Sequence, residues 1–105
     1  MMEAISNKKG WDIVMLDIRP VSLLADYFVM ATGANERQVK AILEEVSTKT
    51  REVEEKPLRV EGTPESGWVL LDYGSVIVHL FIPSQREYYD LEGLWSDAPL
   101  VVRIQ

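Results

Sequence analysis

The first third of the chain alternates short apolar runs with turn-forming residues. Residues 12–18 are apolar and rich in β-branched side chains, which is typical of a buried strand. Arg19 and Pro20 end this strand, because proline cannot donate a hydrogen bond to a sheet. Residues 22–26 are expected to form a turn or one helical turn. Residues 26–32 then predict a second strand, which ends at Gly33.

A longer amphipathic segment follows. Asn35 is a suitable N-cap for a helix, since its side chain can accept a hydrogen bond from the first turn. Apolar residues recur behind it at helical spacing while charged residues fill the other side, which predicts a helix packed on a sheet. The apolar stripe consists of Val39, Ile42, Leu43, Val46 and Val53. Residues 54–57 end the helix, and residues 58–61 predict a short edge strand.

Residues 67–72 and 75–82 are two strongly β-forming segments on either side of Tyr73 and Gly74. This pattern predicts a tight hairpin with Tyr73 and Gly74 as its two loop residues. In that register Asp72 faces Ser75, and the pairing continues to Trp68 opposite His79. A slip of one residue would exchange the two faces, so the assignment of faces depends on the register.

Alternation along the hairpin sorts its side chains onto two faces. The aliphatic face carries Val69, Leu71, Val76, Val78 and Leu80. The mixed face carries Trp68, Leu70, Asp72, Ser75, Ile77, His79 and Phe81. We expect the helix to cover the aliphatic face. The mixed face has the composition of a partner interface; the alternative is that the N-terminal arm or the C-terminal segment packs over it.

The remaining segments are short. Residues 85–95 predict one amphipathic helix, because Tyr88, Leu91, Leu94 and Trp95 fall at helical spacing. Residues 1–10 are expected to be a loose arm or the end of a short helix, and the last residues, 100–105, a terminal strand or a loose tail. Together these elements predict a single small α/β domain over residues 1–105.

Composition narrows the class of partner. The chain has 105 residues, of which 47% are hydrophobic, and it has no cysteine, which excludes disulfides and thiolate metal sites. No apolar run is long enough for a membrane span or a secretion signal, so we expect a cytoplasmic protein. The formal net charge of −6 disfavours direct binding to nucleic acid, because phosphate binding depends on Lys and Arg. A partner within a nucleic-acid machine is therefore expected to be a basic protein.

Motifs for catalysis are missing from the sequence. It contains neither a Gly-rich phosphate loop nor a nucleophile elbow. Asp72, Ser75 and His79 share a predicted face, but nothing orients them as a triad. His79 is the single histidine, and a lone histidine beside aromatic residues is more often structural than a ligand. Asp12 and Asp17 are five residues apart and point to opposite faces of a strand, which does not suit two-metal nucleotidyl transfer.

Three ordered motifs resemble one known family. The first is Asp-Ile-Arg at residues 17–19 with Ser-Leu-Leu-Ala-Asp-Tyr-Phe-Val-Met-Ala-Thr-Gly at residues 22–33. The second is Trp-Val-Leu-Leu-Asp-Tyr-Gly at residues 68–74 with Val78 and His79. The third is Arg-Glu-Tyr-Tyr-Asp-Leu-Glu at residues 86–92 with Leu-Trp-Ser-Asp-Ala at residues 94–98. Together they cover roughly residues 10 to 99 and resemble the Iojap-like ribosomal silencing factors (RsfS).

The resemblance implies a mixed-sheet α/β fold similar to nucleotidyltransferases but without their catalytic acids. It implies a protein that binds the large ribosomal subunit through its protein number fourteen, blocks joining with the small subunit and represses translation when nutrients are scarce. It further implies no cofactor, no catalytic residue and a homodimer off the ribosome. The expected partner-binding residues are Trp68, Leu70, Asp72, Tyr73, His79, Tyr88, Tyr89 and Glu92.

The chain departs from the family pattern at two positions. Gln38 stands where the family usually has histidine, and Ser75 stands where it usually has aspartate. Two other functional hypotheses stay open at this point. One is a homodimeric assembly module that uses the mixed face for self-association, and the other is a small nucleotidyltransferase-like enzyme, which rests on fold analogy alone.

Overall fold

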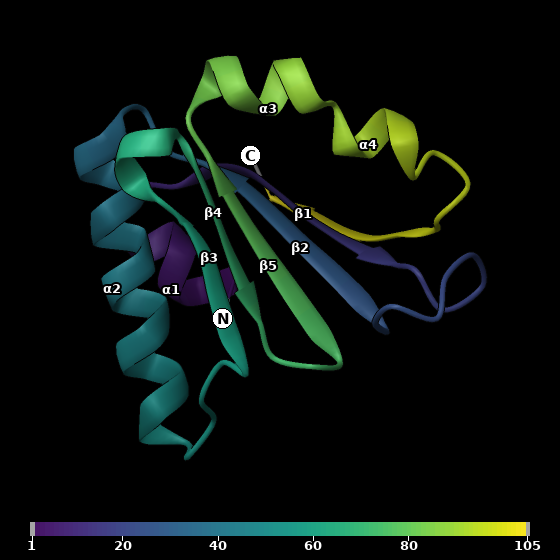
Figure 1. The fold of residues 1–105 in the computed structure, drawn as a ribbon, viewed down its shortest axis with the longest axis horizontal. Coiled ribbons are helices and arrows are strands. Elements are labelled where there is room, and N and C mark those ends of the chain that lie inside the picture. The colour runs from purple at the N-terminus through teal and green to yellow at the C-terminus, as the bar shows by residue number, and fades with distance from the viewer. Residues whose placement is uncertain (1, 105) are drawn as a thin grey trace.

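Six strands form one mixed sheet in the order β3-β4-β5-β2-β1-β6 in the computed structural model, which describes residues 2–104 (Figure 1). The strands are β1 (Trp11–Asp17), β2 (Tyr27–Thr32), β3 (Arg59–Thr63), β4 (Trp68–Asp72), β5 (Val76–Phe81) and β6 (Leu100–Ile104). β2 and β5 pair in parallel, and the other neighbours pair antiparallel. The predicted α/β class with a mixed sheet is therefore confirmed.

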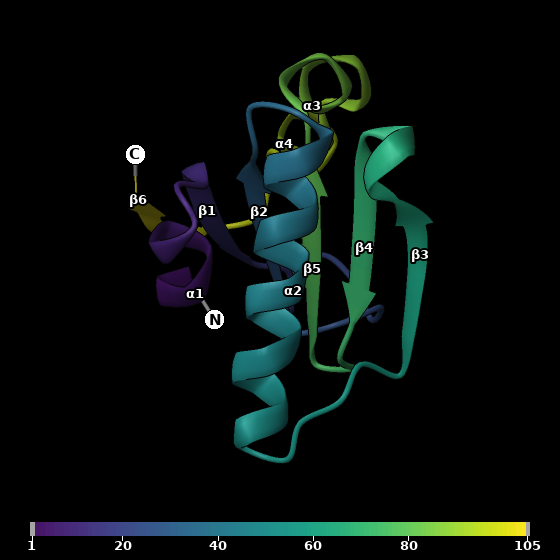
Figure 2. The ribbon, with the colours of Figure 1, turned by 90° about the vertical axis from the view of Figure 1, so that its left-hand side faces the viewer.

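The helices lie on both sides of this sheet. They are α1 (Met2–Asn7), α2 (Glu36–Glu52), α3 (Pro83–Tyr89) and α4 (Leu91–Leu94), with a 3₁₀ turn η1 at Pro64–Ser66. Figure 2 shows α2 along one face beside α1, and both figures show α3 and α4 crossing one end of the sheet. In the part of the chain that the structure describes, no helix is long and apolar enough to cross a membrane.

The predicted amphipathic helix is confirmed as α2. Asn35 is its N-cap and accepts a hydrogen bond from the Gln38 backbone N–H at 3.0 Å. The apolar stripe of α2 packs through Val39, Ile42 and Val46 on the predicted aliphatic face, whose Val69, Leu71, Val78 and Leu80 are fully buried in the same cluster. Val53, also expected in this stripe, is instead the C-cap residue and is 69% exposed, because α2 ends at Glu52. The aliphatic face thus lies under the helix, as its composition predicts.

The mixed face is covered only in part. The C-terminal segment packs over the β1–β2 half of the sheet, where Ala98, Leu91 and Trp95 cover a core that includes Phe28 and Met30. The row formed by Trp68, Leu70 and Asp72 on β4 stays half-buried. The alternative that the C-terminal segment packs over this face is therefore correct for one half of it, because the short segment does not span all six strands. The partner interface stays a prediction for the half that is left open.

The predicted hairpin register is wrong by two residues. Asp72 pairs with Ile77 and Trp68 with Phe81, while Tyr73 donates a backbone hydrogen bond to Val76 O at 2.9 Å. The loop residues are thus Gly74 and Ser75, and Gly74 has a φ of 87°, a conformation that favours glycine at the first loop position. Because side chains alternate with a period of two, a two-residue shift leaves each side chain on its predicted face.

The predicted helix over residues 85–95 is also wrong as one element. Pro83 starts α3 two residues earlier, in the first turn where a missing N–H is tolerated. Asp90 then has a φ of 45° and interrupts the helix, and its side chain accepts a hydrogen bond from Gly93 N at 3.2 Å at the start of α4. The chain therefore turns between two short helices.

Both ends of the chain resolve open alternatives. The N-terminal arm contains the short helix α1, which buries Ala4 and Ile5 against the core under α2. The C-terminal residues 100–104 form β6, which pairs with β1, so the terminal strand is correct and the loose tail is not. Residues 1 and 105 lie outside the described part of the chain.

Candidate functional site

The candidate site lies where β4 begins and α3 ends, at the end of the sheet that α3 crosses. The Trp68 ring packs on Tyr89 of α3, with ring centroids 4.4 Å apart, and on Phe81 of β5 at 5.2 Å. Tyr88 packs edge-on against Tyr89 at 5.1 Å. Tyr88 is 79% exposed and Tyr89 44% exposed, whereas Leu70 and Trp68 are half-buried. We call these four residues, Trp68, Leu70, Tyr88 and Tyr89, the Trp68 surface.

A groove of about 220 Å³ opens beside this surface. Its lining comes from β3, η1, β4 and α3 and consists of Glu61, Gly62, Ser66, Trp68, Leu70, Gln85 and Tyr89. Gly62 is required there, because its φ is 78° and an added Cβ would lie 2.1 Å from the Trp68 backbone oxygen. The glycine therefore lets the edge strand β3 approach β4 closely. The lining of the groove is aromatic and aliphatic at Trp68, Tyr89 and Leu70, and Glu61 adds one carboxylate.

His79 lies behind Trp68 and not on the surface. It is 4% exposed, and its Nδ1 accepts a hydrogen bond from Trp68 Nε1 at 3.2 Å. Burial lowers the pKa of His79 to about 4, so the imidazole is neutral at pH 7. Since Nδ1 accepts, the proton sits on Nε2. Within the expected partner-binding set, His79 can therefore act only by orienting the Trp68 ring.

Two other expected binding residues, Asp72 and Tyr73, make their contacts outside the Trp68 surface. Tyr73 points to the opposite side of the sheet, where its hydroxyl lies 3.0 Å from Thr50 Oγ1 of α2. Asp72 accepts a hydrogen bond from Gly74 N at 2.8 Å and pairs with Arg59 at 3.2 Å. These contacts hold the hairpin and the edge strand, so Asp72 and Tyr73 have structural partners of their own.

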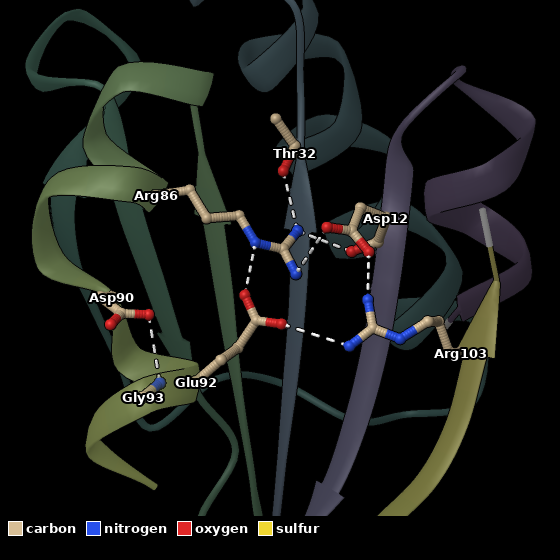
Figure 3. Close-up of polar contacts among 7 residues, drawn as sticks. All are labelled: Asp12, Thr32, Arg86, Asp90, Glu92, Gly93 and Arg103. Atoms are coloured by element: carbon tan, nitrogen blue, oxygen red, sulfur yellow. Dashed lines mark hydrogen bonds and ion pairs between the residues drawn. The ribbon is translucent and has the colours of Figure 1, made fainter. Parts of the chain in front are cut away.

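Glu92 belongs to an ion-pair network at the same end of the sheet (Figure 3). Its Oε1 accepts a hydrogen bond from Arg86 Nε at 3.0 Å, and its Oε2 lies 3.5 Å from Arg103 Nη2. Asp12 pairs with both arginines from the other side, at 3.5 Å to Arg86 Nη2 and 2.6 Å to Arg103 Nη1. We call these four residues the Arg86 network.

Sequence reasoning missed both the groove and the network. Glu61 lies opposite Leu70 in the β3–β4 pair, so a register for the edge strand would have placed it beside the site. The network had no local signal, because Arg86 lies 74 residues from Asp12. Only the family motif, which contains Arg86 and Glu92, drew attention to either residue.

The hypothetical triad has no supporting geometry. His79 Nδ1 is occupied by Trp68, and Asp72 is held by Gly74 and Arg59. Ser75 is an exposed residue of the hairpin loop. Among residues 2–104, no hydrogen bond joins Asp72, Ser75 and His79, so the constellation needed for nucleophilic catalysis is not assembled there.

The fold and this site define a class: a small α/β protein whose exposed aromatic surface is suited to macromolecular contact. A family model described as "Ribosomal silencing factor during starvation" matches residues 1–105. The chain belongs to this family of ribosomal silencing factors, which confirms the resemblance of its three motifs.

Individual relatives agree with this assignment. Ribosomal silencing factor RsfS of Bacillus subtilis is 43% identical over 97 residues, which are 92% of this chain and 82% of that protein. Mouse mitochondrial assembly of ribosomal large subunit protein 1 is 26% identical over 91% of this chain and 43% of its own length. A crystal structure of a Chromobacterium violaceum protein superposes with a TM-score of 0.86 at 40% identity, covering 90% of this chain and 79% of that one.

Proposed function

We propose that this chain silences ribosomes by binding the large ribosomal subunit through its protein number fourteen and sterically blocking the small subunit. Translation is thereby repressed under nutrient limitation, in the cytoplasm and without a cofactor. Membership of the silencing-factor family supports the proposal, and the name of the mouse relative connects that protein with the large subunit. The observation that carries it in this chain is the Trp68 surface.

The composition of the Trp68 surface supports a protein partner. Exposed aromatic residues at the centre of a patch are typical of binding hot spots, because they bury large apolar areas at low entropic cost. Tyr88 in particular has 79% of its surface exposed, and its ring packs edge-on against Tyr89. Such a side chain is available to a partner.

Charge supports a basic partner. The net charge is −6, and the groove beside Trp68 carries Glu61 at its side. Opposite charges steer the encounter of two surfaces and are screened by salt. We therefore expect binding to the large subunit to weaken as the salt concentration rises.

The test is co-sedimentation with isolated large and small subunits, followed by rejoining of the subunits on a gradient. Wild-type protein should bind the large subunit alone and reduce the amount of joined ribosomes. Tyr88→Ala and Trp68→Ala should each weaken binding by roughly thirtyfold, the size of a typical hot-spot loss. Tyr88→Ala is the more informative variant, since this exposed side chain contributes little to folding.

Val53→Ala is the matched control, because Val53 is 69% exposed at the end of α2, on the other layer of the molecule. It should bind like wild type. Unchanged binding of both surface variants would refute the assignment of the Trp68 surface, while absence of wild-type binding to either subunit would refute the proposal itself.

A homodimer is the second candidate function, and the same exposed aromatic residues favour it. If the Trp68 surface serves both dimer and ribosome, the two complexes compete. Sedimentation velocity would then show that added large subunits dissociate the dimer. Tyr88→Ala would weaken both the dimer and the complex with the large subunit. A dimer lost in Tyr88→Ala, with ribosome binding intact, would instead assign the surface to self-association.

A further inference from the structure

The Arg86 network joins four elements that are distant in the sequence. Asp12 comes from β1, Arg86 from α3, Glu92 from α4 and Arg103 from β6, and the carboxylates and guanidinium groups alternate around a ring (Figure 3). The four residues meet because β1 begins, and β2 and β6 end, at the same end of the sheet, which is the end that α3 crosses. Two acids and two arginines balance, so the ring carries no net charge.

Arg86 is the innermost member of the ring. Its side chain is 10% exposed, and its Nη1 donates to the Asp12 backbone oxygen at 2.6 Å and to Thr32 Oγ1 at 2.8 Å. The backbone of Asp12 has a φ of 48°, a left-handed conformation that is uncommon outside glycine. In this conformation the backbone oxygen of Asp12 accepts the hydrogen bond from Arg86. The main-chain acceptor of Asp12 and the side-chain acceptor of Thr32 together hold Arg86 at the end of the sheet.

The two helices that carry Arg86 and Glu92 have few other anchors. α3 has seven residues and α4 four, and neither contains a fully buried residue. Isolated helices of this length are not stable in water, so their position must come from tertiary contacts. Besides the aromatic contacts of Tyr89 and Trp95 and the packing of Leu91 on the core, the Arg86 network provides the charged hydrogen bonds that join these helices to the sheet.

We propose that Arg86 is a positioning residue for the Trp68 surface. Tyr88 and Tyr89 follow it by two and three residues at the end of α3, so anchoring Arg86 fixes where both rings lie. A surface held in its bound arrangement loses less entropy on association, and it therefore binds more tightly. This inference rests on the proposed docking of the Trp68 surface and assigns Glu92 a role inside the protein and not at the partner.

The main test uses Arg86→Lys, which retains the charge but loses the planar group that reaches Asp12, Thr32 and Glu92 together. We expect the affinity for the large subunit to fall about tenfold, as a loss of preorganisation would produce. Hydrogen exchange of the α3 backbone amides should accelerate, while exchange in α2 stays at its wild-type rate. Arg19→Lys is the matched control, since Arg19 makes a two-pronged pair with Asp17 in a distant loop.

Thr32→Val provides a second variant in case Arg86→Lys folds poorly. It is close in shape, and it removes only the hydroxyl that accepts from Arg86 Nη1. We expect the same two changes at smaller size, with no alteration in any residue of the Trp68 surface.

The outcomes separate this inference from the proposed function. Failure of wild-type protein to bind the large subunit would refute the proposed function and this inference with it. If Arg86→Lys and Thr32→Val both bind the large subunit with the affinity of the wild type, the positioning role alone is refuted. Equal acceleration of exchange in α2 and α3 would also refute it, because Arg86 would then support the whole fold and not the docking helix.

Discussion

Acid should destabilise this protein through the protonation of His79. The unfolded chain has an ordinary histidine pKa of 6.5, whereas burial lowers the pKa in the folded protein to about 4. Between these values the unfolded chain binds a proton that the folded protein does not. The stability associated with the neutral imidazole is therefore fully present above pH 6.5 and is lost as the pH falls toward 4.

The size of the effect follows from the two pKa values. The whole difference corresponds to about 3 kcal/mol, and at pH 4.5 most of it is already lost. We expect the free energy of unfolding at pH 4.5 to be about 2 kcal/mol lower than at pH 7 because of His79. The pKa of Asp17 is held below its ordinary value by the hydrogen bond from Arg19, so the loss of that contribution occurs at lower pH.

Urea unfolding at pH 7 and pH 4.5 measures this difference. His79→Gln is the control, since glutamine has no proton to gain in this range and its amide oxygen can accept from Trp68 Nε1. The pH effect that remains in His79→Gln belongs to the carboxylates and is subtracted. NMR titration gives the pKa directly, because His79 is the only histidine of the chain.

Two results would refute the reasoning. One is a pH dependence of unfolding that is the same in wild type and His79→Gln. The other is an imidazole titration near pH 6.5 in the folded protein, which would mean that His79 is hydrated and does not stand behind Trp68 as a neutral acceptor.

Two further predictions concern the fold around the site, and urea unfolding at pH 7 checks both. Leu71→Ala should lower the free energy of unfolding by about 3 kcal/mol, because Leu71 is fully buried under α2. Leu58→Ala, at a position that is 76% exposed, should change it by less than about 0.5 kcal/mol. Equal effects of the two substitutions would contradict the assigned core. Gly62→Ala should cost about 3 kcal/mol and Gly74→Ala about 1 kcal/mol. Both have positive φ, but only at Gly62 would the new Cβ meet a backbone oxygen at 2.1 Å, so a smaller cost at Gly62 than at Gly74 would contradict the close approach of β3 to β4.

Local patterns in the sequence were sufficient for the central strands, for α2 and for the two faces of the hairpin. Period-two alternation identified β4 and β5, and helical spacing behind Asn35 identified α2. The faces were correct even though the hairpin register was not, because an error of two residues preserves the alternation. The break at Asp90 was not predictable from spacing, since the apolar residues on both sides of it continue the same helical pattern.

The candidate site was predictable only in part. Trp68, Leu70, Tyr88 and Tyr89 were expected from the mixed face and the family motifs, and the structure brings them together. The burial of His79 and the turn of Tyr73 toward Thr50 depend on which segments cover each face, which alternation alone does not specify. A part of His79 and Tyr73 in docking therefore remains a prediction.

The sequence by itself determined the α/β class, the amphipathic α2, the two faces of the hairpin and, through its motifs, the family. These features depend on neighbours within a few residues or on the period at which apolar side chains recur along a helix or strand, so the local sequence is sufficient to predict them. Only the tertiary structure decided that β6 extends the sheet beyond β1, that the C-terminal segment covers half of the mixed face, and that Asp12, Arg86, Glu92 and Arg103 form a ring. Those contacts join residues up to 91 positions apart, and they exist only once the chain has folded around its core.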